Sequence, residues 1–170
     1  SFIGLVGSEM CIRDRLYSEA DPLQHRLLKQ LGPEPLEADF NTDYFYQRCR
    51  QRGAAIKQVL MNSHIVVGVG NIYASEALFR AGIRPTRAAR RISKKRLAGL
   101  VDAVRETLAT AIEHGGTTLQ DFTQTDGKPG YFRHELQVYG NTDRCKICAA
   151  PIKHLVQGQR SSYYCPECQS

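Results

Sequence analysis

The sequence contains no apolar stretch approaching the ~20 residues needed to cross a bilayer. Residues 1–15 also lack the basic leader and the long apolar region of a signal peptide, so we expect a cytoplasmic protein with no membrane contact. Internal repeats and low-complexity tracts are missing too. The 170 residues are 42% hydrophobic and 24% charged, which is typical of one medium globular domain or two small ones.

Acidic residues are absent from the segment between positions 84 and 96, which carries seven positive charges. These are Arg84, Arg87, Arg90, Arg91, Lys94, Lys95 and Arg96. The net charge of the whole chain is +6, so the rest of the sequence sums to 6 − 7 = −1. Such an excess suits a polyanionic partner without requiring one. We interpret the segment as a solvated linker and helix start rather than a dedicated phosphate-binding track.

Cysteine is scarce outside the end of the chain, where Cys11 and Cys49 stand alone. The other four form two C-x2-C pairs separated by 16 residues: Cys145, Cys148, Cys165 and Cys168. Two such knuckles supply four thiolates at tetrahedral geometry, which favours one structural Zn²⁺. An iron–sulfur or rubredoxin-like site has similar spacing and is the better alternative. Two disulfides are disfavoured in a cytoplasmic chain.

Apolar residues recur at helical spacing through the middle of the sequence. The stripe Leu97, Leu100, Val101, Val104, Leu108 and Ile112 predicts a long amphipathic helix. Ser93 is its expected N-cap, and Gly115-Gly116 its expected stop. Further helices are predicted over residues 43–52 and 54–61 and around residues 72–79. We expect a helical body over residues 36–114 and then a two-stranded ribbon between the cysteine pairs.

The segment Val66-Val67-Gly68-Val69-Gly70-Asn71-Ile72-Tyr73 is the most informative junction. Two glycines in three residues permit a tight turn with converging N–H groups, and Asn71 is positioned to cap the following helix. Together they form a candidate seat for a phosphate. A plain glycine turn between packed helices explains the spacing equally well. A dinucleotide-binding motif fails, because Tyr73 stands where a third glycine is needed.

Four motifs follow one another along the chain: Leu31-Gly32-Pro33-Glu34-Pro35-Leu36, Val67-Gly68-Val69-Gly70-Asn71-Ile72-Tyr73-Ala74-Ser75-Glu76, Gly115-Gly116-Thr117-Thr118-Leu119 and Asp126-Gly127-Lys128-Pro129-Gly130-Tyr131-Phe132. With the terminal four-cysteine segment, they resemble the C-terminal part of bacterial formamidopyrimidine-DNA glycosylase. Enzymes of this family excise oxidised purines such as 8-oxoguanine from DNA. The sister endonuclease VIII group shares the helix-two-turns-helix and the ribbon, but the last motif resembles the formamidopyrimidine branch more closely.

The resemblance implies a mainly α fold, with a helix-two-turns-helix domain and then a small four-cysteine zinc β-ribbon. We expect residues 36–135 to form the first and residues 136–170 the second. Residues 16–35 are the expected linker from a catalytic N-terminal β-sandwich that is absent here, and residues 1–15 match nothing in the family. Ala149 stands where the family usually has glycine, which should slightly strain the knuckle turn.

The resemblance also assigns roles to individual residues. It implies DNA contacts at Arg52, Lys57, Gly70, Asn71, Tyr139 and Arg160. Arg160 is also implied as proton donor in the second elimination, which makes it the expected catalytic residue. The base-capping loop is expected to contain Thr125, Asp126, Gly127, Lys128, Pro129, Gly130 and Tyr131. Taken without the resemblance, Lys57 could lie on a solvated helix face, and Arg160 could simply be exposed.

In the family, the nucleophile is an N-terminal proline followed by glutamate, whereas this sequence begins Ser1-Phe2. We therefore expect a fragment of a bifunctional DNA glycosylase and AP lyase. It should bind zinc and damaged double-stranded DNA as a monomer, in a bacterial cytoplasm near the nucleoid, with little or no turnover. The alternatives are a non-catalytic zinc-ribbon DNA-binding module, an endonuclease VIII-like glycosylase, and an RNA- or ribosome-associated zinc ribbon. The last of these leaves Gly68 to Glu76 unexplained.

Overall fold

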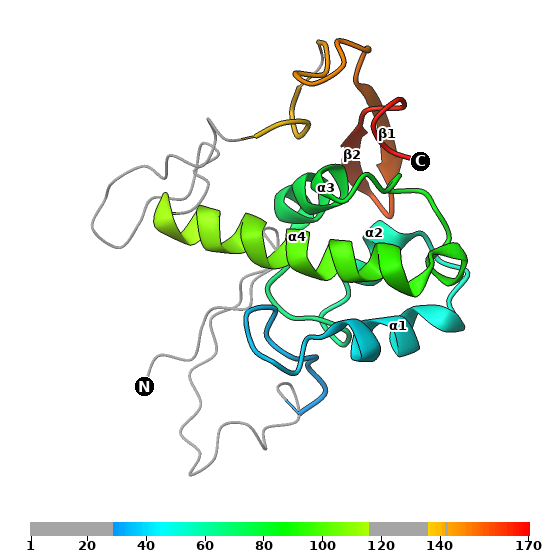
Figure 1. Cartoon of the computed structure of the whole chain (residues 1–170), viewed down its shortest axis with the longest axis vertical. Helices are drawn as coiled ribbons and strands as arrows, with labels where there is room; N and C mark the ends of the chain where they lie inside the picture. Colours follow the sequence, from blue (N-terminus) through cyan, green and yellow to red (C-terminus); the bar gives the residue numbers. More distant parts are fainter. Residues whose placement is uncertain (1–28, 116–135, 142) are drawn as a thin grey trace.

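A computed structural model describes residues 29–115, 136–141 and 143–170. Its helices are α1 (Thr42–Arg50), α2 (Ile56–Leu60), α3 (Asn71–Arg80), the 3-10 turn η2 (Ala89–Arg91) and α4 (Lys94–Glu113). Two strands follow, β1 (Lys153–Gln157) and β2 (Arg160–Tyr164). Helix α4 crosses the molecule, with α1 on one side of it and α3 with the ribbon on the other (Figure 1). The predicted mainly α body with a terminal ribbon is confirmed.

Helix α4 forms where the apolar stripe predicted it. The Ser93 hydroxyl accepts a hydrogen bond from the Arg96 N–H at 3.4 Å, which confirms the predicted N-cap. The helix ends at Glu113, and Gly115 follows with φ +68°, so the predicted stop is also confirmed. Ile112 was wrongly included in the buried stripe, since it is 65% exposed. The last turn of α4 extends past the elements that cover its centre (Figure 1).

Helices α1 and α2 are shorter than the predicted ranges. Asn41 caps α1 by accepting from the Tyr44 N–H at 3.0 Å. Residues 54 and 55 were expected to be helical, but they pair with the chain around η2 instead. The Ala89 N–H donates to the Ala54 carbonyl at 2.9 Å, and Ala55 forms an isolated bridge with Ala88. Helix α2 therefore begins only at Ile56.

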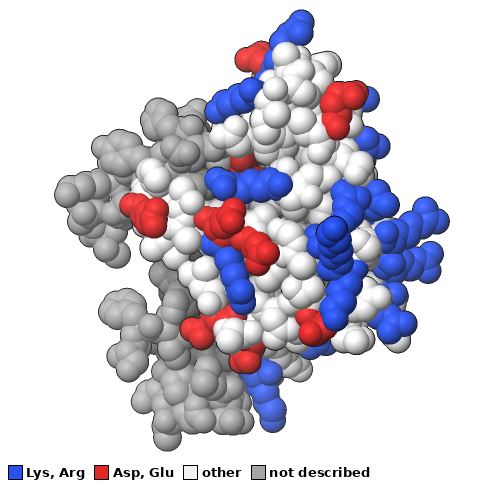
Figure 2. All heavy atoms as spheres, in the orientation of Figure 1, with Lys and Arg blue, Asp and Glu red and all other residues white. Residues whose placement is uncertain are grey.

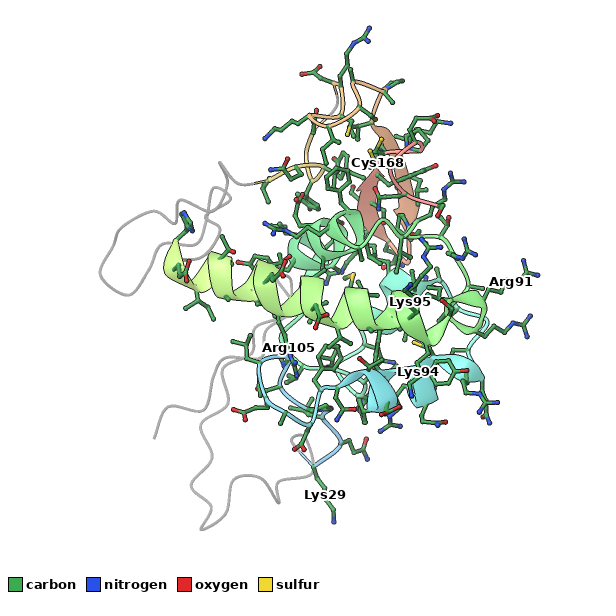
Figure 3. All side chains as sticks on the ribbon, in the orientation of Figure 1. Lys29, Arg91, Lys94, Lys95, Arg105 and Cys168 are labelled. Carbon is green, nitrogen blue, oxygen red and sulfur yellow. The ribbon has the colours of Figure 1, made fainter. Side chains whose placement is uncertain are left out.

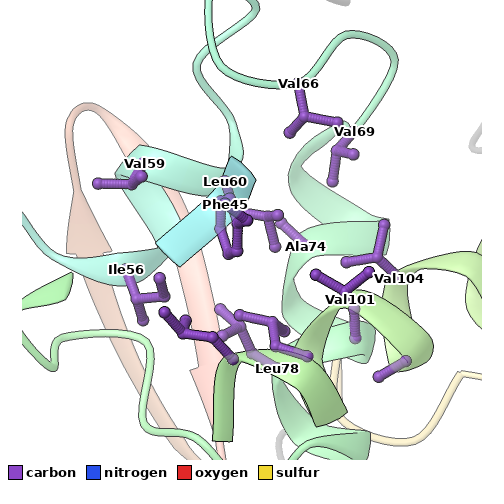
Figure 4. Close-up of a cluster of buried hydrophobic side chains, with 14 of the residues drawn as sticks. Phe45, Ile56, Val59, Leu60, Val66, Val69, Ala74, Leu78, Val101 and Val104 are labelled. Atoms are coloured by element: carbon purple, nitrogen blue, oxygen red, sulfur yellow. The ribbon is translucent and has the colours of Figure 1, made fainter. Parts of the chain in front are cut away.

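The main hydrophobic core lies between α4 and the three shorter helices (Figure 4). Leu78 of α3 and Val101 and Val104 of α4 meet there with Ile56 and Leu60 of α2. All of these side chains are buried, and each contributes roughly 1.5–3 kcal/mol relative to full exposure. This core fixes α3, and thereby the glycine bend that precedes it.

The chain before α1 is anchored to the same body. The Gly32 N–H donates to the Ser63 carbonyl at 2.7 Å, and a Cβ at Gly32 would lie 2.4 Å from the carbonyl carbon of Ile65. Only glycine permits that approach. Arg105 of α4 donates to the carbonyl of Phe40 at 2.7 Å and so holds the segment leading into α1.

The two strands form an antiparallel ribbon in which Lys153 pairs with Tyr164 and Gln157 with Arg160. Gly158 and Gln159 make the turn with φ of +53° and +64°, the left-handed pair that suits a two-residue hairpin. Strand β2 lies against α3 (Figure 1). The ribbon therefore rests on the same helix that follows the glycine bend.

Candidate nucleic-acid interface and metal centre

The Sγ atoms of the four C-terminal cysteines lie within 4.8 Å of one another. Cys145 and Cys168 are 3.8 Å apart, Cys148 and Cys165 3.4 Å, and Cys148 and Cys168 3.5 Å. Tetrahedral Zn²⁺ with Zn–S bonds of about 2.3 Å requires S–S separations of about 3.8 Å. Disulfide sulfurs would instead lie about 2.05 Å apart, and the five cysteines that the structure describes are all free.

The electrostatics of the four thiols also fit a bound cation. Burial tends to raise the pKa of Cys145, but N–H groups of Cys148 and Ile147 outweigh it and lower that pKa to about 7. The neighbouring Cys148 sulfur and burial raise the pKa of Cys168. The shifts of pKa therefore favour the Cys145 thiolate over those of Cys165 and Cys168 when no cation is bound. A dication removes that conflict.

The first knuckle has the strain expected from its sequence. Ala149 has φ +59°, in the left-handed region, while its N–H donates to the Cys145 carbonyl at 2.9 Å. A β-carbon in this conformation costs roughly 1–2 kcal/mol. The structure therefore confirms that Ala149 occupies a position better suited to glycine.

The glycine bend leads directly into α3. Gly68 has φ +80°, and Gly70, not Asn71, is the N-cap residue. The predicted capping role of Asn71 was wrong, because its Oδ1 accepts no N–H of the helix and its Nδ2 donates to the Tyr139 hydroxyl at 3.1 Å. A Cβ at Gly70 would meet nothing within 4 Å, so packing does not explain this glycine.

Asn71 is itself a buried polar side chain with an unsatisfied atom. Its Oδ1 has no hydrogen-bond partner among the described residues. The O and N of an amide are interchangeable by a 180° rotation. In the rotated form the Tyr139 hydroxyl donates to Oδ1. The Nδ2 group, a donor, then occupies the position that has no hydrogen-bond partner. That form is suited to an anion.

Glu76 has a structural role that the sequence did not reveal, since it stood out there only as the last residue of a motif. Its carboxylate is 2% exposed and accepts three backbone hydrogen bonds, from Gln137 at 2.8 Å, Val138 at 3.0 Å and Tyr139 at 2.8 Å. It therefore fixes the segment entering the zinc ribbon to the helix that begins at Asn71. The available signal was an acidic residue in a helix that is apolar on almost every side.

Lys57 lies beneath the ribbon and is 2% exposed, so the interpretation of a solvated helix face was wrong. Its ammonium group donates to the Ser161 carbonyl and the Ser162 hydroxyl, each at 2.8 Å. Burial and, to a smaller extent, the charge of Arg160 lower the pKa of Lys57 to about 8. Lys57 thus holds the backbone immediately after Arg160, at the start of β2.

The basic segment 84–96 divides into two parts. Arg84 donates to the Pro166 carbonyl at 3.2 Å, and Arg96 donates to the Gly82 and Ser170 carbonyls at 2.8 and 3.0 Å. For these two arginines the prediction of a solvated linker was wrong, because they bind the chain's C-terminal end to the helical body. Arg90, Arg91 and Lys95 are exposed, as predicted.

The other predicted site residues are distributed as follows. Arg52 follows α1, and its guanidinium donates to the Arg48 carbonyl at 2.7 Å. The base-capping residues 125–131 lie outside the described residues. Within the described residues, no helix is both long and apolar enough to cross a membrane.

The fold and this site define a class of protein that combines a helix-two-turns-helix domain with a four-cysteine zinc finger. Residues 31–123 match the family of the formamidopyrimidine-DNA glycosylase H2TH domain, and residues 143–170 match the zinc finger found in FPG and IleRS. The chain belongs to the formamidopyrimidine-DNA glycosylase family, a family of DNA-repair proteins. The four cysteines are arranged to bind one zinc ion, as predicted.

Curated relatives agree with this assignment. Formamidopyrimidine-DNA glycosylase of Idiomarina loihiensis is 57% identical over 155 residues, which cover 91% of this chain and 57% of the relative. The enzyme of Thioalkalivibrio sulfidiphilus is 56% identical with the same coverage. The chain thus spans a little over half the length of the curated relatives it matches.

Solved structures show the same fold. The MutM (FPG) protein of Thermus thermophilus superimposes with a TM-score of 0.81 at 39% identity, covering 87% of this chain and 57% of that one. An FPG mutant of Lactococcus lactis in complex with Fapy-dG-containing DNA gives 0.78 at 33% identity, covering 85% and 53%.

Proposed function

We propose that these 170 residues form the DNA-gripping part of a bifunctional DNA glycosylase and AP lyase that removes oxidised purines, including 8-oxoguanine and formamidopyrimidines. The observation that carries the proposal is the direct connection between the glycine bend and the zinc ribbon. Asn71 binds Tyr139, and Glu76 binds the backbone of residues 137–139. Two phosphate-binding elements are thereby held at a fixed separation.

The first element is the start of α3. The N–H groups of a first helical turn have no acceptor within their own helix, and together with the helix dipole they favour a phosphate, which the open space at Gly70 admits. The Asn71 amide in its rotated form adds a donor beside them. Tyr139 supports that orientation and supplies a further contact to the DNA backbone.

The second element is the arginine at the ribbon turn. Arg160 grips the phosphates around the extruded nucleotide and donates the proton in the second elimination. Lys57 serves this element by holding the adjacent backbone at Ser161 and Ser162. Arg52 contacts the DNA backbone beyond the ribbon. Zinc, when bound, fixes the fold of the ribbon that carries Arg160.

Two grips on the backbone suit the chemistry of base excision. A stacked base is inaccessible, and extruding it costs a few kcal/mol, which contacts with flanking phosphates offset. In the proposed reaction an amine attacks the sugar C1′, displaces the base and forms a Schiff base that eliminates the phosphates. Residues 125–131 would cover the extruded base.

The 170-residue polypeptide alone should bind damaged duplex as a monomer but not turn it over. Its Pro-Glu pairs, Pro33-Glu34 and Pro166-Glu167, are internal, so their proline nitrogens are amides and not nucleophiles. Borohydride reduction on abasic-site DNA should therefore trap no covalent adduct. A strong adduct would overturn the proposed inactivity of this polypeptide, but not the proposed DNA grip.

Binding to a duplex with a tetrahydrofuran abasic-site analogue tests the grip itself. We expect Asn71→Ala to weaken binding, and Asn71→Asp to weaken it further, because Asp removes the donor and adds a negative charge. Arg160→Gln should reduce the slope of log affinity against log salt by about 0.9. Arg80→Gln, on the exposed end of α3, is the matched control. Failure of the unaltered polypeptide to bind at low ionic strength would overturn the proposal.

A further inference from the structure

The distribution of charge over the described surface is strongly uneven. Between Tyr44 and Val101 the only acidic residue is Glu76, and it is buried. Figure 2 shows positive side chains crowded along one side of the molecule, to the right in this view, and Figure 3 places Arg91, Lys94 and Lys95 toward that side. Lys94 is paired with Asp43, whereas Arg91 and Lys95 form no ion pair with any residue that the structure describes.

We define the basic ridge as the exposed or half-buried cations contributed by the end of α1, by η2 and by the first turn of α4. Its members are Arg48, Arg50, Arg52, Arg90, Arg91 and Lys95. The backbone joins its two halves, because the Arg90 N–H donates to the Arg52 carbonyl at 3.0 Å. Segments 40 residues apart in sequence thus present one surface.

Three of these arginines are held in place by neighbouring groups. The guanidinium of Arg48 lies over the Tyr44 ring at 5.1 Å, and that of Arg50 lies over the Tyr46 ring at 5.8 Å. Arg52 donates to the Arg48 carbonyl. A positively charged surface with restrained side chains loses less conformational entropy when it binds an anion.

The ridge is continuous with the ribbon turn that carries Arg160. A Cβ at Gly158 would lie 3.3 Å from the side-chain nitrogen of Gln58 in α2. The Gln157 amide donates to the Pro85 carbonyl at 3.5 Å, and the Ile56 N–H donates to the Arg87 carbonyl at 2.8 Å. The ribbon and α2 are therefore both hydrogen-bonded to residues 85–87, which lead into η2.

The chemistry of the ridge favours a polyanion over other partners. The exposed large hydrophobic residues among those described are Leu36, Ile112, Ile147 and Val156, and the ridge contains none of them. Like charges held close together repel one another, and a phosphate backbone relieves that repulsion while it releases counterions. The ridge residues offer charge without large apolar side chains, which favours a phosphate backbone over a partner that binds through apolar contacts.

We propose that the basic ridge is an additional DNA-binding surface, which grips the phosphates of undamaged duplex flanking the lesion. The inference rests on the proposed function, since the ridge continues the grip begun at Arg160. Its contacts go to phosphates and not to base edges, so they add affinity without lesion or sequence preference. They would help the protein to hold ordinary duplex during the search for a lesion.

The test compares Arg90→Gln/Arg91→Gln with Arg90→Lys/Arg91→Lys, with Arg80→Gln as a single-charge control. Both ridge side chains are exposed, and circular dichroism melting should show folded variants. Affinity for an undamaged duplex and for an abasic-analogue duplex of the same length is measured at 50 and 200 mM salt.

We expect the Gln pair to lower the salt slope by about 1.8 on both duplexes, at about 0.9 for each phosphate contact. When the salt is raised from 50 to 200 mM, the Gln pair should therefore lose about ten-fold less affinity than the unaltered chain. The Lys pair should keep the slope, and Arg80→Gln should not change it. An unchanged slope in the Gln pair overturns the ridge while the grip at Asn71 and Arg160 stands. Absence of binding by the unaltered chain overturns both.

Discussion

The carboxylate of Glu76 and the backbone N–H of Tyr139 are joined by a 2.8 Å hydrogen bond between residues 63 positions apart. The same carboxylate also accepts from Gln137 and Val138. Helix α3 therefore carries the proposed phosphate seat at its first residue and, five residues later, the carboxylate that anchors residues 137–139. The proposed seat and this anchor are separated by little more than one helical turn.

Replacing Glu76 with Gln should destabilise the protein by about 2 kcal/mol, because a donor amide then faces backbone donors and leaves one of them unsatisfied. Urea unfolding of the zinc-loaded chain measures this change. Glu106→Gln is the control, since its 3.9 Å ion pair with Arg80 is largely exposed and contributes little. A Glu76→Gln variant as stable as the control would contradict an anchoring role.

The sequence predicted the parts that rest on local periodicity and on short-range spacing. The stripe of α4, its cap at Ser93 and the four-cysteine centre all follow from residues close together in the chain. The position of Lys57 could not be predicted in this way, because its partners Ser161 and Ser162 lie more than 100 residues away. A lysine on a short helix is ordinarily solvated, and only the packing of the ribbon buries it.

The same limit explains the errors over Asn71 and the basic segment. An asparagine after a glycine is a good cap by local rules, but the Asn71 side chain instead donates a hydrogen bond to Tyr139, which belongs to a distant segment. Arg84 and Arg96 lie in a sequence segment that looks solvated, yet they donate hydrogen bonds to carbonyl groups near the C-terminus. In each case a long-range hydrogen bond outweighed a local preference.

Gln169 should couple the zinc centre to the helical body. It is fully buried, its amide donates to the Ile83 carbonyl at 2.8 Å, and its Oε1 accepts from the Cys165 N–H at 2.8 Å. Gln169→Ala leaves both partners unsatisfied, so we expect a loss of about 2–3 kcal/mol in stability and weaker zinc retention against a chelator. Ser170→Ala, which keeps the backbone contacts, is the control. Equal zinc retention in the two variants would contradict the coupling.

The buried ammonium group of Lys57 should make stability depend on pH in a defined direction. Its pKa falls from 10.5 to about 8 on folding, so between these values the unfolded chain binds more protons than the folded one. Stability attributable to Lys57 therefore rises as pH increases from about 8 to 10.5 and is lowest below pH 8. The difference in unfolding free energy between the unaltered chain and Lys57→Met should increase over this window. A difference that stays flat or falls would show that the group is not desolvated.

Ala149 offers a test in which a smaller side chain should stabilise the protein. Its φ of +59° is strained for alanine and unstrained for glycine, and the hydrogen bond from its N–H to the Cys145 carbonyl does not involve the side chain. Relief of roughly 1–2 kcal/mol of strain in the folded state exceeds the roughly 0.4–1 kcal/mol by which glycine stabilises the unfolded chain through its greater entropy. Ala149→Gly should therefore raise the melting temperature of the zinc-loaded chain and slow its loss of zinc to a chelator.

Ala150→Gly, one residue further on and outside the left-handed region, should lower stability instead, because it adds unfolded-state entropy and relieves no strain. If both substitutions destabilise alike, the turn at the first knuckle is not strained, and its alanine has no measurable effect on the metal centre.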